Sequence, residues 1–399
     1  MLNTTAEVDA IVSGHTHLAY NHVIDGRPVI SSGQYGEKFS KMEIQFDRAT
    51  KKISKITNEV YNLMDGSTPL YLDDPEVKPI VDQAKIVADE LGNVVLGEAS
   101  ANFNRAAFAP LGGASYPENR GGESTLGNFV ADVQLWALNE DGTREVDVTF
   151  MNPGGLRANI DAGEVTYREA AAVQPFANTL VTMNLTGEKI KAVLEEQWQP
   201  AGASRPFLKL GVSEGLTYTY DPVAAKGSHI TSIRLNGEPL DPAATYSVGV
   251  NSFLGTGGDN FLTLATGTGK ADSGKIDLES MVDWFAANGT ATPEYAQRAV
   301  GVKVSAPDAD GYDVGDQVTV NLSSLDFSTN EPAAGTVVVS LGGVDLGSAP
   351  VDRSFTPTLD NIGQATVAFT IPEGATGSQT FQISVPTTGT SSWFTLTVD

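Results

Sequence analysis

A change in hydrophobic periodicity near residue 300 constrains the fold of this chain more than any other feature of its sequence. Before this point, alternating apolar runs that predict strands are interleaved with segments whose apolar residues recur at helical spacing. After it, only short alternating runs remain, separated by Gly, Pro, Asp and Ser. These runs lie at residues 317–322, 336–341, 365–371, 380–385 and 392–398. We therefore expect an α/β (α+β) fold up to residue 299 and an all-β, immunoglobulin-like sandwich over residues 300–399.

The region before residue 300 is divided by a segment rich in Asp and Pro that leads into a helical run. Asp74 can cap this helix, and Pro75 suits its first turn. The apolar residues that follow fall on one helical face. They are Val77, Ile80, Val81, Ala84, Val87, Ala88 and Leu91. We predict a linker and connector helix at residues 63–93, between an N-terminal part at residues 1–62 and a second domain at residues 94–299.

The composition excludes several classes of function. There is no cysteine, so a transition metal would have to be bound by His, Asp, Glu, Asn or Gln. The 25 Lys and Arg residues against 49 Asp and Glu give a net charge of −24, which disfavours binding to nucleic acid polymers or anionic membranes. We find no apolar run of about 18 residues that would predict a membrane span, and no signal peptide pattern at the start. A small anionic ligand would need a local basic pocket.

The segment 150–157 carries the strongest sign of a binding site. An alternating apolar run predicts a half-buried strand that ends there at Asn-Pro-Gly-Gly, because proline lacks the amide donor of a sheet ladder. The strand would bring Asn152 and Arg157 to the rim of a loop. Gly154 and Gly155 leave the backbone open to a ligand, and the arginine suits phosphate or carboxylate. The alternative is a surface turn with one solvated arginine.

Two further segments and one arginine complete the candidate site. Phe176 lies in an irregular segment before a strand, where an aromatic ring is either a plug over the core or an exposed stacking platform. Phe253 and Asp259 bracket a glycine-rich loop that follows another strand. Arg120 precedes a predicted helix, where it could bind a phosphate together with the helix amides, or simply be an exposed loop residue.

A Gly-His-Thr-His turn near the N-terminus suggests metal binding. A short apolar strand runs directly into it, so His15 and His17 would project into the same loop space. Neutral imidazole nitrogens are common metal ligands. Two histidines alone are too few to hold a catalytic metal pair. The alternative is that two of the four histidines of the chain happen to share a turn.

These segments together resemble a known family, the secreted 5′-nucleotidases, which include bacterial UDP-sugar hydrolases and 2′,3′-cyclic phosphodiesterases. The resemblance covers roughly residues 1–300 and rests on five motifs in the family's order. They are Gly14-His-Thr-His17, Glu123-Ser-Thr-Leu-Gly-Asn128, Asn152-Pro-Gly-Gly-Leu-Arg157, Gln174-Pro-Phe-Ala-Asn-Thr179 and Asn251-Ser-Phe-Leu-Gly-Thr-Gly-Gly-Asp259. The family joins a metallophosphoesterase domain to a C-terminal substrate domain, so the resemblance implies that residues 1–62 are the last part of the former and residues 94–299 are the latter.

The resemblance also implies roles for the candidate residues. Phe176 and Phe253 would be the two faces of an aromatic clamp around the base, which would tolerate any base. Asp259 would accept hydrogen bonds from ribose hydroxyls, and Asn152 would hold the edge of the base or ribose. Arg157, with Arg120, would bind the phosphate. The implied ligand is thus a nucleotide or nucleoside.

For the metal site, the resemblance implies a pair of divalent metals, Zn, Mn or similar, in full-length members. His15 would be a metal ligand, and His17 a ligand or a phosphate contact. The family's other ligands come from Asp-x-His, Gly-Asp, Asn-His-Glu or Asn-His-Asp motifs and a further His upstream of the Gly-His-x-His turn, and this sequence has none of them. We expect no catalytic residue in this chain, little activity on its own, and exposed apolar strands that need a missing N-terminal portion.

Two other functions stay open beside nucleotide hydrolysis. The chain could be a nucleoside-binding module without catalysis, or a cell-surface protein in which the sandwich matters most. The family resemblance implies an extracellular, cell-wall or periplasmic location, and abundant Gly, Thr, Ala and Asp would suit an exported bacterial protein.

Overall fold

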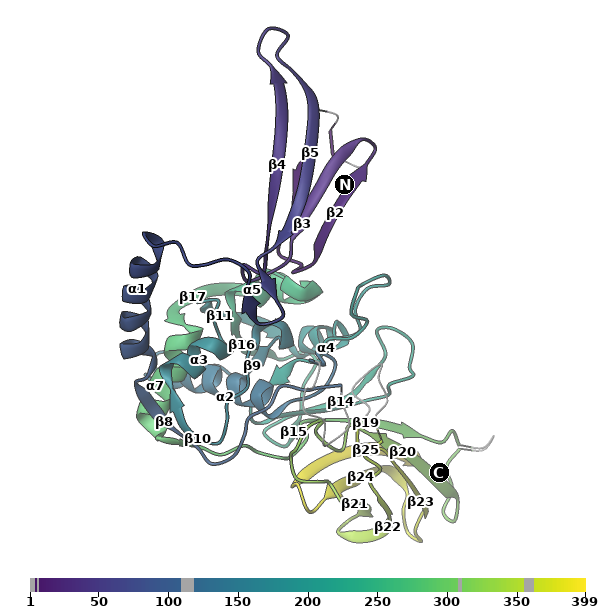
Figure 1. Ribbon diagram of the computed structural model, residues 1–399. Coiled ribbons are helices and arrows are strands. Elements are labelled where there is room, and N and C mark those ends of the chain that lie inside the picture. Colours follow the sequence, from purple (N-terminus) through teal and green to yellow (C-terminus); the bar gives the residue numbers. More distant parts are fainter. Residues whose placement is uncertain (1–3, 6, 109–117, 308–310, 355–361) are drawn as a thin grey trace. The chain divides into compact units, whose positions relative to one another are not determined.

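The computed structural model (Figure 1) describes residues 4, 5, 7–108, 118–307, 311–354 and 362–399. The chain divides into two compact units, Met1–Ala88 and Asp89–Asp399. We refer to them as unit 1 and unit 2 and describe each by itself. The division of the chain into four parts at residues 62, 93 and 299 stays a prediction.

Unit 1 consists of short sheets with a small core. Three strands pair in the order β1-β3-β2, and the long strands β4 and β5 form an antiparallel hairpin. The strands are β1 Ile11–Val12, β2 Ala19–Ile24, β3 Arg27–Ser32, β4 Lys38–Asp47, β5 Lys52–Asn62, β6 Met64–Asp65 and β7 Thr68–Pro69. Only β3 is largely buried, with Val29 and Ile30 at its centre. Large apolar side chains such as Val12, Val23 and Phe46 are exposed.

Helix α1 (Val77–Gly92) begins where the sequence predicts. The Asp74 carboxylate accepts hydrogen bonds from the backbone N–H groups of Glu76, at 2.8 Å, and Val77, at 3.1 Å. The predicted apolar face is present, but its residues are exposed, including 70% of Ile80. Because the apolar face is exposed, the start of this helix depends on the local cap at Asp74.

A five-stranded sheet forms the centre of unit 2, in the order β12-β9-β16-β11-β17. Its strands are β9 Val148–Met151, β11 Thr179–Thr186, β12 Gly211–Val212, β16 Thr245–Asn251 and β17 Thr268–Ile276. Both faces of β9 are covered, because alternate side chains enter different layers. Val148 and Phe150 belong to a core shared with helix α4 (Gly187–Glu195), whereas the Thr149 hydroxyl donates to the Ala131 carbonyl of α2 (Thr125–Asn139) at 2.6 Å.

Shorter elements surround this sheet. Helix α7 (Asp277–Asn288) packs on α2, where the Phe129 and Trp284 rings meet edge to face at 5.1 Å. Helix α3 (Tyr167–Val173) begins with a reciprocal capping box between Thr166 and Glu169. The remaining elements of this part are β8 Val95–Ala99, β10 Gly163–Thr166, β18 Thr290–Ala291, η1 Pro153–Gly155, α5 Ser252–Gly255, η2 Gly258–Asn260 and α6 Leu262–Ala265.

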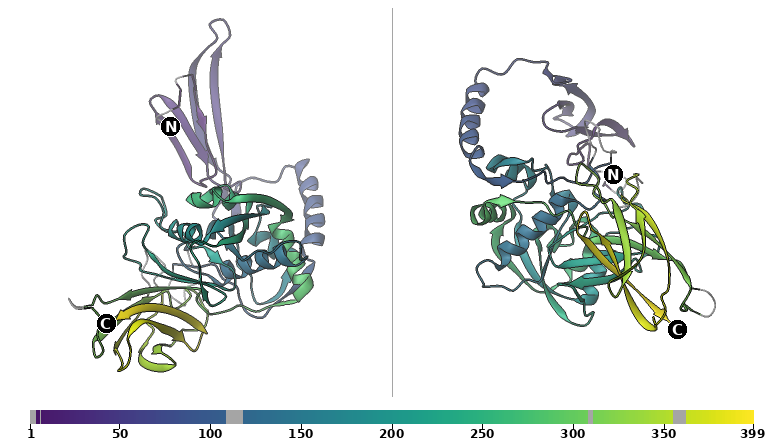
Figure 2. Two further views of the ribbon diagram at one scale, coloured as in Figure 1. Left: turned by 180° about the vertical axis from the view of Figure 1, so that it is seen from behind. Right: turned by 90° about the horizontal axis from the view of Figure 1, so that it is seen from below.

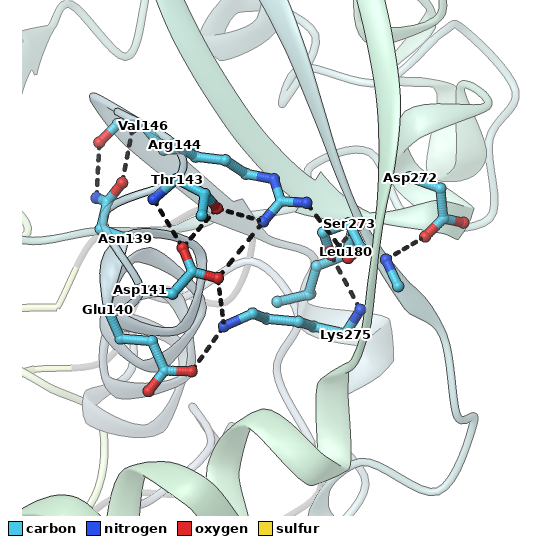
Figure 3. A network of polar contacts seen from close by, with 11 residues as sticks. Asn139, Glu140, Asp141, Thr143, Arg144, Val146, Leu180, Asp272, Ser273 and Lys275 are labelled. Atoms are coloured by element: carbon cyan, nitrogen blue, oxygen red, sulfur yellow. Dashed lines mark hydrogen bonds and ion pairs between the residues drawn. The ribbon is translucent and has the colours of Figure 1, made fainter.

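Polar contacts fix the C-terminal end of α2 and the start of β9 (Figure 3). The Asn139 side chain donates to the Val146 carbonyl at 3.0 Å and accepts from its N–H at 2.8 Å. The Lys275 ammonium lies 2.6 Å from the Glu140 carboxylate, so a cation stands beside the negative end of the helix dipole. These contacts hold the strand whose other end carries the Asn-Pro-Gly-Gly turn.

The last strands of unit 2 form two sheets, drawn in green to yellow in Figure 2. They have the orders β15-β14-β13-β19-β20-β23 and β22-β21-β24-β25. Residues of β19, β20 and β23 share one apolar core with the second sheet, whereas the buried residues of β13 and β14 belong to the core shared with α4. The strands are β13 Leu216–Tyr220, β14 Ile230–Leu235, β15 Glu238–Pro239, β19 Ala299–Val304, β20 Gln317–Ser323, β21 Thr336–Leu341, β22 Val344–Pro350, β23 Ala365–Thr370, β24 Gly377–Val385 and β25 Thr390–Val398. All five predicted runs are strands. The parallel pairing of β13 with β19 continues one sheet across residue 300.

Candidate functional site

The Asn-Pro-Gly-Gly turn lies directly after β9, as the sequence predicts. Asn152 is extended, with φ −76° and ψ 140°, and the chain then tightens into η1. A Cβ atom on Gly155 would lie 2.5 Å from the Met151 methyl group and 3.1 Å from the Asn152 side-chain oxygen. A side chain at this position would therefore force the Met151 and Asn152 side chains to shift.

Three polar side chains form a relay from β16 to the glycine-rich loop. The Asn251 amide donates to Asn152 Oδ1 at 3.0 Å, and the Asn152 amide donates to Asp259 Oδ2 at 2.9 Å. Both asparagines are buried, and Asn251 also caps α5 by accepting from the Leu254 N–H at 2.9 Å. In the part of the chain that the structure describes, no hydrogen bond is recorded for Asp259 Oδ1. The relay thus orients one carboxylate and leaves one of its oxygens available.

Arg120 joins this group at Gly154. A Cβ atom on Gly154 would lie 2.9 Å from Arg120 Nη1 and 3.3 Å from Asp259 Oδ2. A guanidinium and a carboxylate therefore approach the same bare stretch of backbone. Arg120 Nε donates to Glu118 Oε2 at 2.9 Å, and this contact sets the direction of the guanidinium.

Three arginines create a local positive charge in a strongly acidic chain. Glu118 bridges two of them, because its other oxygen lies 3.5 Å from Arg105 Nη1. Burial lowers the pKa of Arg105; Glu118 opposes this shift, and the like charges of Arg157 and Arg120 add to it. One carboxylate thus pairs with two guanidinium groups, and the charge of a third also acts on Arg105, an arrangement that favours an anionic ligand.

Arg105 also borders a cavity of about 240 Å³. The cavity is lined by Asn102, Asn104, Arg105, Ala106, Ala107, Glu118, Asn159, Asp161, Thr329 and Asn330. Neither Arg105 nor Glu118 stands out in the sequence, because neither belongs to a recognisable motif. Glu118 is a near neighbour of Arg120 in the chain, whereas Arg105 is brought to Glu118 by folding.

The two candidate aromatic residues are exposed, with 55% of Phe176 and 44% of Phe253 accessible to solvent. Phe176 is therefore not a plug over the core. The guanidinium carbon of Arg157 lies 6.0 Å from the centre of the Phe176 ring. Phe253 lies against the glycine-rich loop, since a Cβ atom on Gly258 would be 2.5 Å from its ring. Among the described residues, no ring contact joins Phe176 to Phe253.

His15 and His17 lie in unit 1, in the turn after β1. Both have left-handed backbones, with φ of 67° and 60°, and both side chains are exposed. The His17 ring meets Tyr35 edge to face at 5.3 Å. Within the described ranges, no group of three or more His, Cys, Asp or Glu residues could hold a metal ion. Two imidazoles fall short of the three protein ligands of a catalytic zinc, so these residues do not fit a metal pair.

Comparison with known proteins gives consistent matches. Residues 98–266 match the family model described as "5'-nucleotidase, C-terminal domain". Endonuclease YhcR of Bacillus subtilis is 26% identical over 288 residues, which are 70% of this chain and 21% of that protein. Protein UshA of Salmonella pullorum is 33% identical over 144 residues, covering 36% of this chain and 24% of that protein. The chain thus spans about a quarter or less of the length of these two relatives.

The fold is shared with a solved structure of a putative 5′-nucleotidase from Staphylococcus aureus. Its TM-score is 0.53 at 17% identity, over 71% of this chain and 56% of that chain. The matched family is one of phosphoesterase hydrolases. Within this chain, the similarity to the C-terminal domain of that family covers residues 98–266. No helix among the described residues has both the length and the apolar character needed to cross a membrane.

Proposed function

We propose that unit 2 binds a nucleotide at the ends of β9 and β16, as the substrate-binding part of a nucleotide phosphohydrolase. The observation that carries this proposal is the meeting of Arg120 and Asp259 at the bare backbone of Gly154. One group suits a phosphate and the other suits sugar hydroxyls. A nucleotide presents both chemistries a few ångströms apart.

Arg120 and Arg157 would bind the phosphate of the ligand. The Arg120 guanidinium is held by Glu118 through Nε, so its terminal nitrogens are directed to the Gly154 turn. Arg157 contributes a second planar fork of donors, which matches the geometry of phosphate oxygens. Together they offset the general repulsion that a chain of net charge −24 exerts on an anion.

Asp259 and the two exposed phenylalanines would bind the nucleoside part of the ligand. Asp259 Oδ1 accepts from ribose hydroxyls, while Asn152 holds Oδ2. Asn152 is buried, so we assign it mainly to orienting Asp259, beside the contact with base or ribose that the sequence suggests. Phe176 and Phe253 offer exposed faces for stacking on the base, worth ~1–3 kcal/mol for each contact.

Hydrolysis is a separate question from binding. The family is metal-dependent, and His15 and His17 are the candidate metal ligands that the sequence motifs suggest. Because they do not fit a metal pair, the role that we propose for this chain is to hold and orient the substrate. In a full-length family member, His15 would be one metal ligand among several, and His17 a ligand or phosphate contact, beside ligands that are not found in this sequence.

The relatives support a proposal about the location. One of them is named "Cell wall protein Lmo0130", from Listeria monocytogenes, and is 28% identical over 279 residues. We propose an extracellular or cell-envelope location for this chain as well. The strand-rich segment after residue 300 would then serve as an immunoglobulin-like spacer or attachment module.

Calorimetric titration with adenosine tests the aromatic part of the proposal. Replacing Phe253 by alanine should weaken adenosine binding by about five- to hundredfold, because a stacking contact of ~1–3 kcal/mol is lost. Phe46→Ala in unit 1 removes an equally exposed ring and is the matched control. If adenosine and AMP do not bind the unaltered protein, the result favours the alternative, a cell-surface module without a nucleoside site. If Phe253→Ala binds adenosine as before, the stacking role is wrong.

A further inference from the structure

The segment that follows α4 makes hydrogen bonds to the loop that contains Asp259. This loop comprises residues 258–263, and we call it the 258–263 loop. The Gln199 amide donates to the Asp259 carbonyl at 3.0 Å and to the Glu196 carbonyl at 3.0 Å. Its oxygen accepts from the Asn260 side chain at 2.7 Å. Gln199 is 8% exposed, so all of these contacts are made in a largely buried place.

The backbone of the 258–263 loop explains why it needs such support. Asp259 has φ 53° and ψ 26°, and Asn260 has φ 64°. Two successive residues with side chains are therefore in the left-handed region, which Asp and Asn tolerate better than other residues with side chains but still less well than glycine. Such conformations persist only where the surroundings hold them. Gln199 contacts both of these residues.

A second contact anchors the far end of the same loop. Both Glu196 carboxylate oxygens accept from the Thr263 N–H, at 3.0 and 3.2 Å, and the Thr263 hydroxyl donates to Oε1 at 2.8 Å. Burial raises the pKa of Glu196, and the hydrogen bonds from Thr263 oppose this rise. The loop is thus fixed at Asp259 and at Thr263 by two side chains that are three residues apart in the chain.

We propose that Gln199 is a positioning residue of the nucleotide site, which holds Asp259 in its left-handed conformation so that its free carboxylate oxygen faces the ligand. Glu196 supports the same loop from its other end. Neither residue touches the nucleotide. The inference rests on the proposed function, since it assigns Asp259 the recognition of sugar hydroxyls.

The test replaces Gln199 by methionine, which keeps the length of the side chain and removes all three hydrogen bonds. AMP affinity should fall about tenfold, the usual result of losing a hydrogen bond to a charged group. Affinity for 2′,3′-dideoxy-AMP, which lacks both hydroxyls, should change by less than about twofold. In an Asp259→Ala background, Gln199→Met should have no further effect on AMP affinity, because it acts through that carboxylate.

The matched control is Gln197→Met, two residues away. Gln197 is fully buried and makes hydrogen bonds to the Leu194 carbonyl, the Tyr218 hydroxyl and the Leu210 N–H, but none to the 258–263 loop. It should lower stability at least as much as Gln199→Met while leaving AMP affinity unchanged. Thr263→Val, which removes one hydroxyl, gives a milder variant if Gln199→Met does not fold.

Three results of the binding measurements would overturn the inference. They are unchanged AMP affinity in Gln199→Met, equal losses for AMP and its dideoxy form, and an equal loss in Gln197→Met. Hydrogen exchange of the 258–263 loop without ligand separates this inference from the proposed function. Faster exchange of this loop in Gln199→Met than in Gln197→Met is expected if Gln199 holds the loop, even if AMP does not bind the unaltered protein. Equal exchange in the two variants would overturn the inference.

Discussion

Replacing Arg298 by methionine is expected to destabilise unit 2 by about 3–5 kcal/mol, the usual result of removing one partner from a buried ion pair. Arg298 is 6% exposed and makes a two-pronged contact with Asp132, at 2.7 and 2.8 Å. It also donates to the Val212 carbonyl at 2.7 Å and to Glu294 at 2.9 Å. Methionine would fill much of the same space but would leave Asp132 without its cation.

The loss should depend on pH in a defined direction. Burial raises the pKa of Asp132, although the hydrogen bonds and charge of Arg298 oppose the rise. Without Arg298 this pKa rises further. A carboxyl group with a raised folded-state pKa adds stability below its unfolded pKa and loses that contribution as the pH rises through the folded pKa. The difference in free energy of unfolding should therefore be largest near neutral pH and shrink toward about pH 4, the ordinary value for Asp.

Urea unfolding followed by tryptophan fluorescence measures this effect, since all four tryptophans lie in unit 2. Arg168→Met is the control, because Arg168 pairs with Asp89 at an exposed site, where an ion pair contributes about 0–1 kcal/mol. A loss below about 1 kcal/mol in Arg298→Met, or a deficit that grows as the pH falls, would contradict the buried-pair account.

Local signals in the sequence were sufficient to predict much of the fold. The cap at Asp74, the end of β9 before Pro153 and the alternating runs after residue 300 all depend on near neighbours in the chain, and the structure has each of them. Strand β22 was missed. Its residues, Val-Asp-Leu-Gly-Ser-Ala-Pro, include only one β-branched side chain and end in Gly-Ser-Ala-Pro, which favours a turn. The strand forms by pairing with β21 after the left-handed Gly342-Gly343 turn.

What the sequence could not predict is contact between distant segments. Asn251 and Asp259 were recognisable as parts of a motif, but their connection through Asn152 depends on β9 and β16 lying side by side. Arg105 and Gln199 gave no signal, because an arginine or glutamine outside a motif is usually a surface residue. The continuation of one sheet across residue 300 was hidden in the same way, since parallel pairing leaves no local pattern.

Replacing Arg120 or Arg157 is the change for which we predict the largest effect on binding. Arg120→Met and Arg157→Met should each weaken AMP binding by about ten- to hundredfold, because each removes charge-assisted hydrogen bonds worth about 1.5–3 kcal/mol. Adenosine, which has no phosphate, should bind each variant within about twofold of the unaltered protein. Calorimetric titration with AMP and with adenosine measures the ratio of the two affinities for each variant.

Arg234→Met is the control for this pair, since Arg234 stacks on Trp393 and donates to the Gly237 carbonyl, outside the site. In the double variant Arg120→Met/Arg157→Met, AMP should bind no more tightly than adenosine. Equal losses for AMP and adenosine would instead mean that the arginines maintain the shape of the turn at Gly154. A loss for AMP alone in Arg120→Met, with Arg157→Met unaffected, would place the phosphate on the Gly154 side and leave Arg157 to the Phe176 ring that it faces.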